Sequence, residues 1–268
     1  MGKFSREISE LIIEKISIKK YFHIEKLKDV QDVLKALNFV LLQKKEVLKK
    51  EFSAEVFEDL KRYEEIEPKV LRILKDFGKD DYVRDYNICS NYSQVHIKGN
   101  ITLKTKENFI NIREFSGGIA FSSKDLYLIE EIKVLGQKVI IIESLTAFNN
   151  YEEADGAFIY LGGLQNFVRQ EMLIKILNSN KCQYYYYGNI DVESLKIYNY
   201  LKRKTNIPFQ SLNMSKEMLI SNRECCKELS ANDKKALTEI LEDEKYIQFN
   251  DVVRFMLKEN IKLEYERV

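Results

Sequence analysis

The chain has 268 residues, enough for one large domain or two ordinary ones with a sizeable core. Its net charge is only +1, which excludes a globally basic protein and confines any nucleic-acid surface to a local patch. Hydrophobic residues make up 45% of the chain, yet no stretch approaches the roughly 20 apolar residues of a membrane span. With Glu7, Glu10 and Glu14 near its start, the chain has no recognisable signal peptide, so we expect a cytoplasmic protein with reduced thiols.

Residues 1–78 are predicted to form a helical amino-terminal region. Apolar residues recur at helical spacing over three stretches, and a further short helix is expected after Pro68, ending at Phe77 and Gly78. The three stretches are Ser5–Lys19, Leu27–Leu41 and Phe52–Tyr63.

Within that region, Ile24–Val40 fits two structures. One is a helix-turn-helix or winged-helix core, with Asn38–Val40 as the turn into a wing. The other is an amphipathic helical bundle. The bundle is favoured because the turn has no glycine and the helices show no clear basic face.

Residues 79–136 are predicted to be a small strand-rich connector. Gln94–Ile112 alternates loosely between apolar and polar residues, which indicates two or three short antiparallel strands. Ser122 or Ser123 then suits the N-cap of a helix whose apolar face runs from Leu126 to Ile132.

Residues 137–268 alternate strand and helix, which predicts an α/β domain with a parallel sheet. The expected strands are Val139–Ile142, Ala157–Leu161 and Gln183–Tyr187. The expected helices are Asn166–Leu177, Val192–Lys204, Met214–Asn222, Ala231–Leu241 and Phe249–Lys258. The last residues, Lys262–Val268, suit a final strand or tail beside the sheet.

Two acidic residues follow strands of this sheet. Glu143 comes directly after Val139–Ile142, and Asp191 follows Gln183–Tyr187 and a short turn. Because open α/β sheets hold their sites at the carboxyl ends of the strands, the two side chains suit Mg²⁺ or Mn²⁺. An acid in this position is also a common helix N-cap, and spacing leaves both roles open. Tyr184–Tyr187 suits base stacking or, more often, a buried strand.

Four motifs in order give the chain a resemblance to a known family over residues 94–268. They are Ile142–Phe148, Gly162-Gly163, Tyr187–Asp191 and Leu263–Glu266. Together they resemble the Toprim-domain proteins of the Wadjet anti-plasmid type, in particular the carboxyl-terminal domain of the Wadjet nuclease subunit. That family is in turn similar to the A subunit of type VI topoisomerases, in which a winged helix precedes a Toprim domain.

The resemblance implies a set of metal ligands. The family's glutamate falls on Glu143, and the second acid of its DxD pair falls on Asp191. The first acid of that pair is replaced by Asn189, which removes one negative charge from the site. The terminal acidic motif falls on Glu264 and Glu266. Ser194 stands where the family has a glycine and Ser144 where it commonly has asparagine.

The function implied is a Mg²⁺-dependent endonuclease that cuts double-stranded DNA with water as the nucleophile. Its implied setting is plasmid defence with a condensin-like ATPase complex, and a homodimer suits the cutting of both strands. Four cations on the helix after Asp191 suit a phosphate track or a plain solvated face: Lys196, Lys202, Arg203 and Lys204. The alternatives are a catalytically impaired Toprim-fold module for DNA binding or scaffolding, and an unrelated α/β enzyme of phosphate chemistry.

Overall fold

The protein is described by a computed structural model that covers residues 27–43, 45–77, 86–160, 166–179 and 181–265. The chain forms two compact units. The first comprises Met1–Ser93 with Gln165–Arg169, and the second comprises Gln94–Leu164 with Gln170–Val268. The predicted mixed α/β fold, with a largely parallel sheet and a helical amino-terminal region, is confirmed. Within the described ranges, no helix is both long and apolar enough to cross a membrane.

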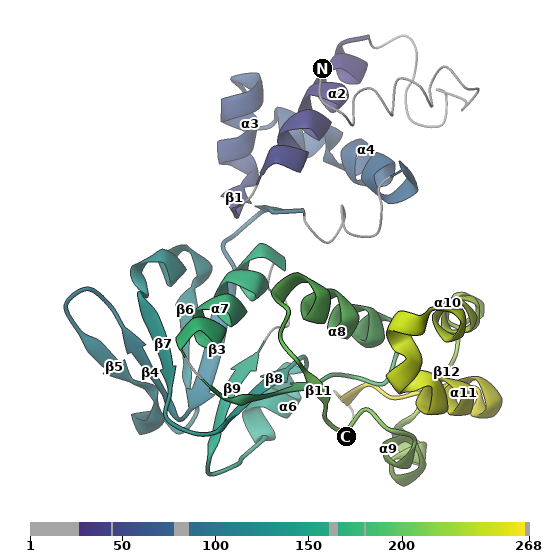
Figure 1. Cartoon of the computed structure of the whole chain (residues 1–268). Helices are drawn as coiled ribbons and strands as arrows, with labels where there is room; N and C mark the ends of the chain where they lie inside the picture. The colour runs from purple at the N-terminus through teal and green to yellow at the C-terminus, as the bar shows by residue number, and fades with distance from the viewer. Residues whose placement is uncertain (1–26, 44, 78–85, 161–165, 180, 266–268) are drawn as a thin grey trace. The chain divides into compact units, whose positions relative to one another are not determined.

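Over residues 27–77, the first unit contains three described helices, labelled in Figure 1. They are α2 (Leu27–Leu42), α3 (Lys49–Phe57) and α4 (Arg62–Phe77). A short parallel pair joins β1 (Val47–Leu48) to β2 (Ile88–Cys89). The helices share one core because each presents an apolar stripe to the others, including Val33, Leu37, Phe52, Val56, Tyr63, Ile66, Val70 and Leu74.

Several expected boundaries in this unit are wrong. The predicted turn at Asn38–Val40 lies inside α2, where Val40 is buried in the core. α3 ends at Phe57 because Glu58 adopts a left-handed backbone with φ of 58°. α4 begins at Arg62 and continues through Pro68 instead of starting after it. The predicted helix over Ser5–Lys19 lies outside the described residues.

Arg62 ties α4 to α2 through charge. Its Nη2 lies 2.6 Å from Asp29 Oδ1, and its Nε lies 2.7 Å from Asp32 Oδ2. Lys69 Nζ reaches the second Asp29 oxygen at 2.9 Å. The hydrogen bonds from Arg62 and then Lys69 lower the pKa of Asp29 to about 2. Asp29 keeps 19% of its side-chain surface exposed, so water screens part of this attraction.

We expect Asp29→Asn to lower the free energy of unfolding at neutral pH by about 1 kcal/mol. The folded pKa of Asp29 lies below its ordinary value, so its contribution is complete above about pH 4 and disappears as the pH falls toward 2. Urea unfolding followed by circular dichroism should therefore separate the variant from the parent at pH 7 and less so in acid. Glu65→Gln is the control, because Glu65 also pairs with Arg62 but is 61% exposed. This account would be contradicted if both variants lost the same free energy of unfolding. It would also be contradicted if the difference in stability between Asp29→Asn and the parent grew in acid.

The second unit is organised around a six-stranded sheet with the order β11-β10-β8-β9-β3-β6. The strands β8, β9, β10 and β11 are parallel, whereas β3 is antiparallel to both β9 and β6. The sheet strands are β3 (Gln94–Gly99), β6 (Ile119–Ser122), β8 (Lys138–Ile142), β9 (Gly156–Tyr160), β10 (Gln183–Tyr187) and β11 (Gln210–Ser211).

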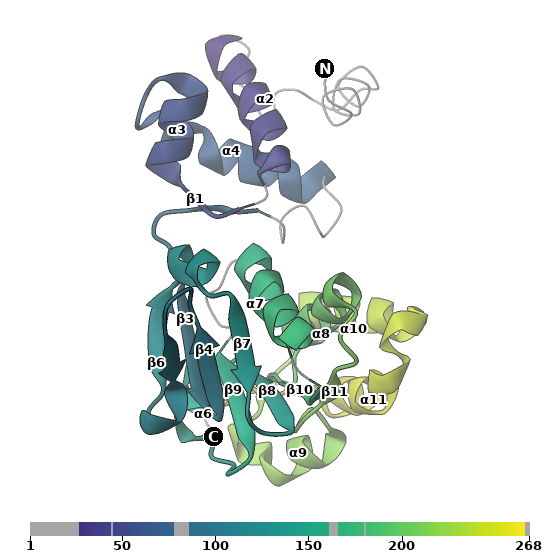
Figure 2. The same cartoon turned by 60° about the vertical axis from the view of Figure 1, so that its left-hand side comes forward.

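Helices cover both faces of the parallel strands. On one face, Phe148 of α6 (Leu145–Asn150) packs with Ile140, Ile142 and Phe158. Figures 1 and 2 show α8 (Val192–Thr205) on the opposite face, together with α7 (Asn166–Ser179). Tyr186 points to the α8 side, where its ring lies 5.6 Å from that of Tyr198. A strand buried on both faces explains the continuous apolar run of β8.

A second sheet has three antiparallel strands in the order β5-β4-β7. They are β4 (Ile101–Lys104), β5 (Phe109–Asn111) and β7 (Glu131–Val134). The predicted α-helix over Leu126–Ile132 is therefore wrong in its second half. Ser122 does cap a helix, since its side chain accepts the Lys124 N–H, but this is the 3-10 helix η3 (Ser123–Leu128). Ile132 and Val134 belong to β7 because they pair with β4.

The carboxyl-terminal helices are α9 (Lys216–Ser221), α10 (Ala231–Glu242) and α11 (Asn250–Glu259). Short 3-10 helices lie between the main elements: η2 (Ile112–Glu114), η4 (Arg223–Cys225) and η5 (Glu244–Phe249). The chain then returns toward the sheet, as expected. β13 (Ile261–Lys262) pairs with β12 (Lys227–Glu228), and Leu263 forms a bridge with Ile190 just beyond β10.

Candidate functional site

Glu143 stands at the carboxyl end of β8. Its backbone N–H donates to the Tyr187 carbonyl at 3.0 Å, which continues the parallel pairing with β10. Its carboxylate oxygen Oε2 accepts hydrogen bonds from the Ser194 hydroxyl at 2.6 Å and from the Tyr186 hydroxyl at 3.1 Å. The strand therefore brings the carboxylate to the sheet edge, and two hydroxyl donors fix its orientation.

Asp191 stands at the carboxyl end of β10 and is the N-cap of α8. Its Oδ1 accepts the Ser194 N–H at 2.8 Å. Ser194 thus contacts both acids, through its backbone to Asp191 and through its hydroxyl to Glu143. The N-cap role that spacing left open is real, and it also holds Asp191 beside Glu143.

Burial raises the pKa of both acids. For Glu143 the charge of Asp191 raises the pKa further, while hydrogen bonds from Ser194 and Tyr186 lower it. For Asp191 the charge of Glu264 raises the pKa further, against the hydrogen bonds from Ser194 and the charge of Lys262. A cation between the two acids would relieve this repulsion.

Gly188 makes room for the Glu143 carboxylate. A Cβ added there would lie 2.4 Å from the Tyr186 ring and 2.9 Å from Glu143 Oε2. The sequence placed Gly188 in a turn and in the Tyr187–Asp191 motif, and it placed Tyr186 in a strand suited to base stacking or to the core; neither was predicted to contact Glu143. Ser194 was noted as a departure from a family pattern, although a position three residues after an N-cap acid is where a bonded N–H is expected.

Asn189 is already engaged in the fold. Its Oδ1 accepts the Tyr265 N–H at 2.8 Å, which anchors the terminal segment beside β10. Glu264 is engaged as well, since its carboxylate forms an ion pair with Lys227 and lies 3.9 Å from Lys262 Nζ. Glu266 lies outside the described residues. The amide and the terminal acid therefore have partners of their own within the protein.

The acids fit a site with two protein carboxylates. Among the described residues, no group of at least three His, Cys, Asp or Glu side chains is arranged to hold a metal ion. Mg²⁺ needs fewer, because it commonly takes one or two carboxylates and keeps waters for its other positions. Glu143 and Asp191 provide such a hard-oxygen pair, joined through Ser194.

The four cations suggested for DNA contact are spread along α8. Lys196 is half-buried near the start of the helix, whereas Lys202, Arg203 and Lys204 lie in its last turn. With a rise of 1.5 Å per residue, that last turn is about 16–20 Å along the helix from Asp191. Two of these cations contact aromatic rings of the same helix. Lys202 Nζ lies 5.8 Å from the Tyr198 ring centroid, and the Arg203 guanidinium lies 5.9 Å from that of Tyr200.

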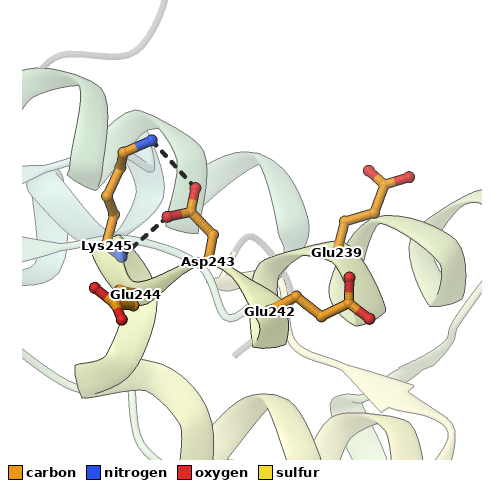
Figure 3. Close-up of a pocket in the computed structure, with 5 residues that line it drawn as sticks. All are labelled: Glu239, Glu242, Asp243, Glu244 and Lys245. Atoms are coloured by element: carbon orange, nitrogen blue, oxygen red, sulfur yellow. Dashed lines mark hydrogen bonds and ion pairs between the residues drawn. The ribbon is translucent and has the colours of Figure 1, made fainter.

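A hollow of about 150 Å³ opens on the α6 side of the sheet, near the carboxyl end of β10. It is lined by Thr146, Ala147, Asn150, Tyr151, Tyr187 and Tyr265. A larger hollow of about 580 Å³ lies away from the sheet edge, where α10 meets η5 (Figure 3). That hollow is acidic, being lined by Glu239, Glu242, Asp243, Glu244 and Lys245, and Asp243 already accepts from the backbone and side chain of Lys245.

Comparison with known proteins gives the chain a family. Residues 101–268 match the family described as Wadjet protein JetD, C-terminal. The chain is also 26% identical over 259 residues to Wadjet protein JetD of Bacillus cereus (strain Q1), an alignment that covers 91% of this chain. The chain spans 63% of the length of that relative. By the match over its second unit, the chain belongs to the Wadjet protein JetD, C-terminal family.

Proposed function

We propose that Glu143 and Asp191 bind a divalent metal ion, Mg²⁺ or Mn²⁺, and that the protein is a DNA endonuclease of Toprim type. The observation that supports this most is the pair of half-buried acids at the carboxyl edge of the parallel sheet, joined by Ser194. We further propose that it acts in a Wadjet system against plasmids, on double-stranded DNA, with other Wadjet subunits that include a condensin-like ATPase. A homodimer would present two such sites to the two strands.

The chain's own residues have clear tasks in this proposal. Glu143 and Asp191 hold the cation, and their two negative charges offset its two positive charges. Ser194 and Tyr186 orient Glu143, and Gly188 leaves the space that its carboxylate occupies. The bound cation would supply Lewis-acid polarisation of a phosphate oxygen.

The test is cleavage of supercoiled plasmid by the purified chain. With Mn²⁺ or Mg²⁺ present we expect nicked and linear products, and with EDTA we expect none. An unchanged plasmid with either metal would overturn the nuclease proposal for this chain.

Asn189→Asp should strengthen metal binding by about tenfold, because it adds a negative charge beside two acids that already favour a cation. The new carboxylate can still accept the Tyr265 N–H that Asn189 Oδ1 accepts at 2.8 Å, so the fold should persist. Titration calorimetry with Mn²⁺ measures the change. Asn91→Asp, at an exposed position before β3, is the control for a general charge effect. Equal affinities in parent and Asn189→Asp would contradict a role for residue 189 near the cation.

A second candidate function is a DNA-binding or scaffolding module that has lost catalysis. It is favoured by the engagement of Asn189 with Tyr265 and of Glu264 with Lys227, which leaves the two-acid pair without a third described carboxylate. This candidate predicts that the protein retains duplex DNA in a gel-shift assay and leaves the plasmid uncut with either metal.

A further inference from the structure

The hollow on the α6 side of the sheet is built mainly from aromatic rings. The ring centroids of Tyr151 and Tyr187 lie 5.7 Å apart, and those of Tyr187 and Tyr265 lie 4.8 Å apart. The Tyr265 hydroxyl donates to the Asn213 carbonyl at 2.5 Å, which fixes the Tyr265 ring. Edge-to-face contacts with neighbouring rings hold Tyr187 and Tyr151 beside it.

The rim of the hollow is polar and belongs to α6. Asn150 and Thr146 are exposed, and the hydrogen bonds found among the described residues include none to either side chain. An amide offers a donor and an acceptor side by side, which is the arrangement that pairs with the edge of a nucleobase. Flat rings below and a free amide at the rim therefore suit a planar ring with a hydrogen-bonding edge.

Size narrows the ligand further. The hollow holds about 150 Å³, several times the roughly 30 Å³ that one water occupies in the liquid and less than the roughly 300 Å³ of the smallest drug-sized pockets. That volume suits one ring system.

The hollow and the proposed metal site share one edge of the sheet but lie on its opposite faces: Tyr187 packs on the α6 side, whereas the Glu143 carboxylate accepts from Tyr186 and Ser194 on the α8 side. The Tyr187 carbonyl accepts the Glu143 N–H at 3.0 Å, and the Tyr265 N–H donates to Asn189 at 2.8 Å. Thr146 and Ala147 lie in the first turn of α6, whose N-cap is Ser144, the residue after Glu143. A DNA strand that places a base in the hollow would therefore have to pass over this sheet edge to bring a phosphate to the acids.

We propose that this hollow, the α6 pocket, receives one unstacked nucleobase of the DNA strand that the site cleaves. The proposal rests on the proposed function and adds to it a means of holding the strand. Stacking on tyrosine and pairing with Asn150 would favour DNA that exposes a base, as at a mismatch, a bend or a single-stranded segment.

The test compares two labelled single strands of equal length and charge by fluorescence anisotropy, in EDTA, with the whole chain. One strand consists entirely of abasic nucleotides, and the other carries a single 2-aminopurine base at its centre. We expect the strand with the base to bind at least about fivefold more tightly. Because the chain contains no tryptophan, the fluorescence of 2-aminopurine reports stacking without interference.

Asn150→Ala should remove most of this preference, and Asn149→Ala should leave it intact. Asn149 is the matched control because it is the adjacent exposed asparagine of α6 and does not line the pocket. Equal binding of the two strands by the parent, or equal effects of the two substitutions, would overturn the α6 pocket. Since no metal is present, this result is separate from cleavage: a protein that cuts plasmid without preferring the base refutes only the pocket.

Discussion

Glu143→Gln is expected to reduce plasmid cleavage by about 100-fold or more, because it removes one of the two charges that we propose hold the cation. Glutamine has nearly the same shape, and its amide oxygen can still accept from Ser194, which donates to Glu143 Oε2 at 2.6 Å. The variant should therefore fold as the parent does. A nicking assay with Mn²⁺, fitted for initial rates, measures the loss.

The control for this prediction is Glu152→Gln, an exposed glutamate in the segment after α6. It removes the same charge from the same unit and should cut at the parental rate. If Glu143→Gln retained parental cleavage while remaining folded, the acid at the end of β8 would have no part in the chemistry.

Phe148→Ala is expected to lower the free energy of unfolding by about 3–5 kcal/mol, the usual range for truncating a buried phenylalanine. Phe148 is only 2% exposed and packs on Ile140, Ile142 and Phe158. The ammonium group of Lys98 lies 5.1 Å from its ring centroid and donates to the Asn149 carbonyl at 3.1 Å. A helix as short as α6 is not stable by itself, so this side chain is its main anchor to the sheet.

Leu145→Ala provides the comparison within the same helix, because Leu145 is 41% exposed. Leu145→Ala should lower the free energy of unfolding by less than about 1 kcal/mol. Urea unfolding of both variants measures the difference, and similar losses would contradict the anchoring role of Phe148. Since α6 also carries Thr146 and Asn150, Phe148→Ala should weaken the base preference of the α6 pocket as well.

The strands of the parallel sheet could be predicted because their signal is local. Ile140 and Ile142 lie in an apolar run that only a doubly covered strand explains, and β8 and β10 appear where that run indicated. Glu143 and Asp191 followed from the same logic, since parallel strands bring their carboxyl ends to one edge.

The wrong predictions of secondary structure share a different cause, which is contact between residues that are far apart in the sequence. Ile129 and Ile132 have the spacing of one helix face, but Ile132 pairs with β4 and therefore lies in the strand β7. Pro68 suggested the start of a helix, yet α4 begins before it and continues past it, because the helix buries Tyr63 and Ile66 in the core. Pro68 itself is exposed, so the backbone carbonyl that loses its partner one turn earlier can bond water.

Local sequence patterns could not predict the hydrogen bonds and ion pairs of the site residues either. The engagement of Asn189 by Tyr265 joins positions 76 residues apart, and that of Glu264 by Lys227 joins positions 37 apart. No short motif encodes such pairs. The aromatic walls of the α6 pocket likewise come from three separate segments, at Tyr151, Tyr187 and Tyr265.

The central claim is that Glu143 and Asp191 together hold a divalent cation, and Mn²⁺ binding followed by electron paramagnetic resonance tests it without reference to activity. Asp191→Asn is a suitable partner for Glu143→Gln, because asparagine caps a helix as well as aspartate does. We predict that the parent chain binds Mn²⁺ and that each substitution weakens this binding by at least about tenfold. Binding of equal strength in the parent and both variants, or no binding by the parent at millimolar Mn²⁺, would contradict the claim.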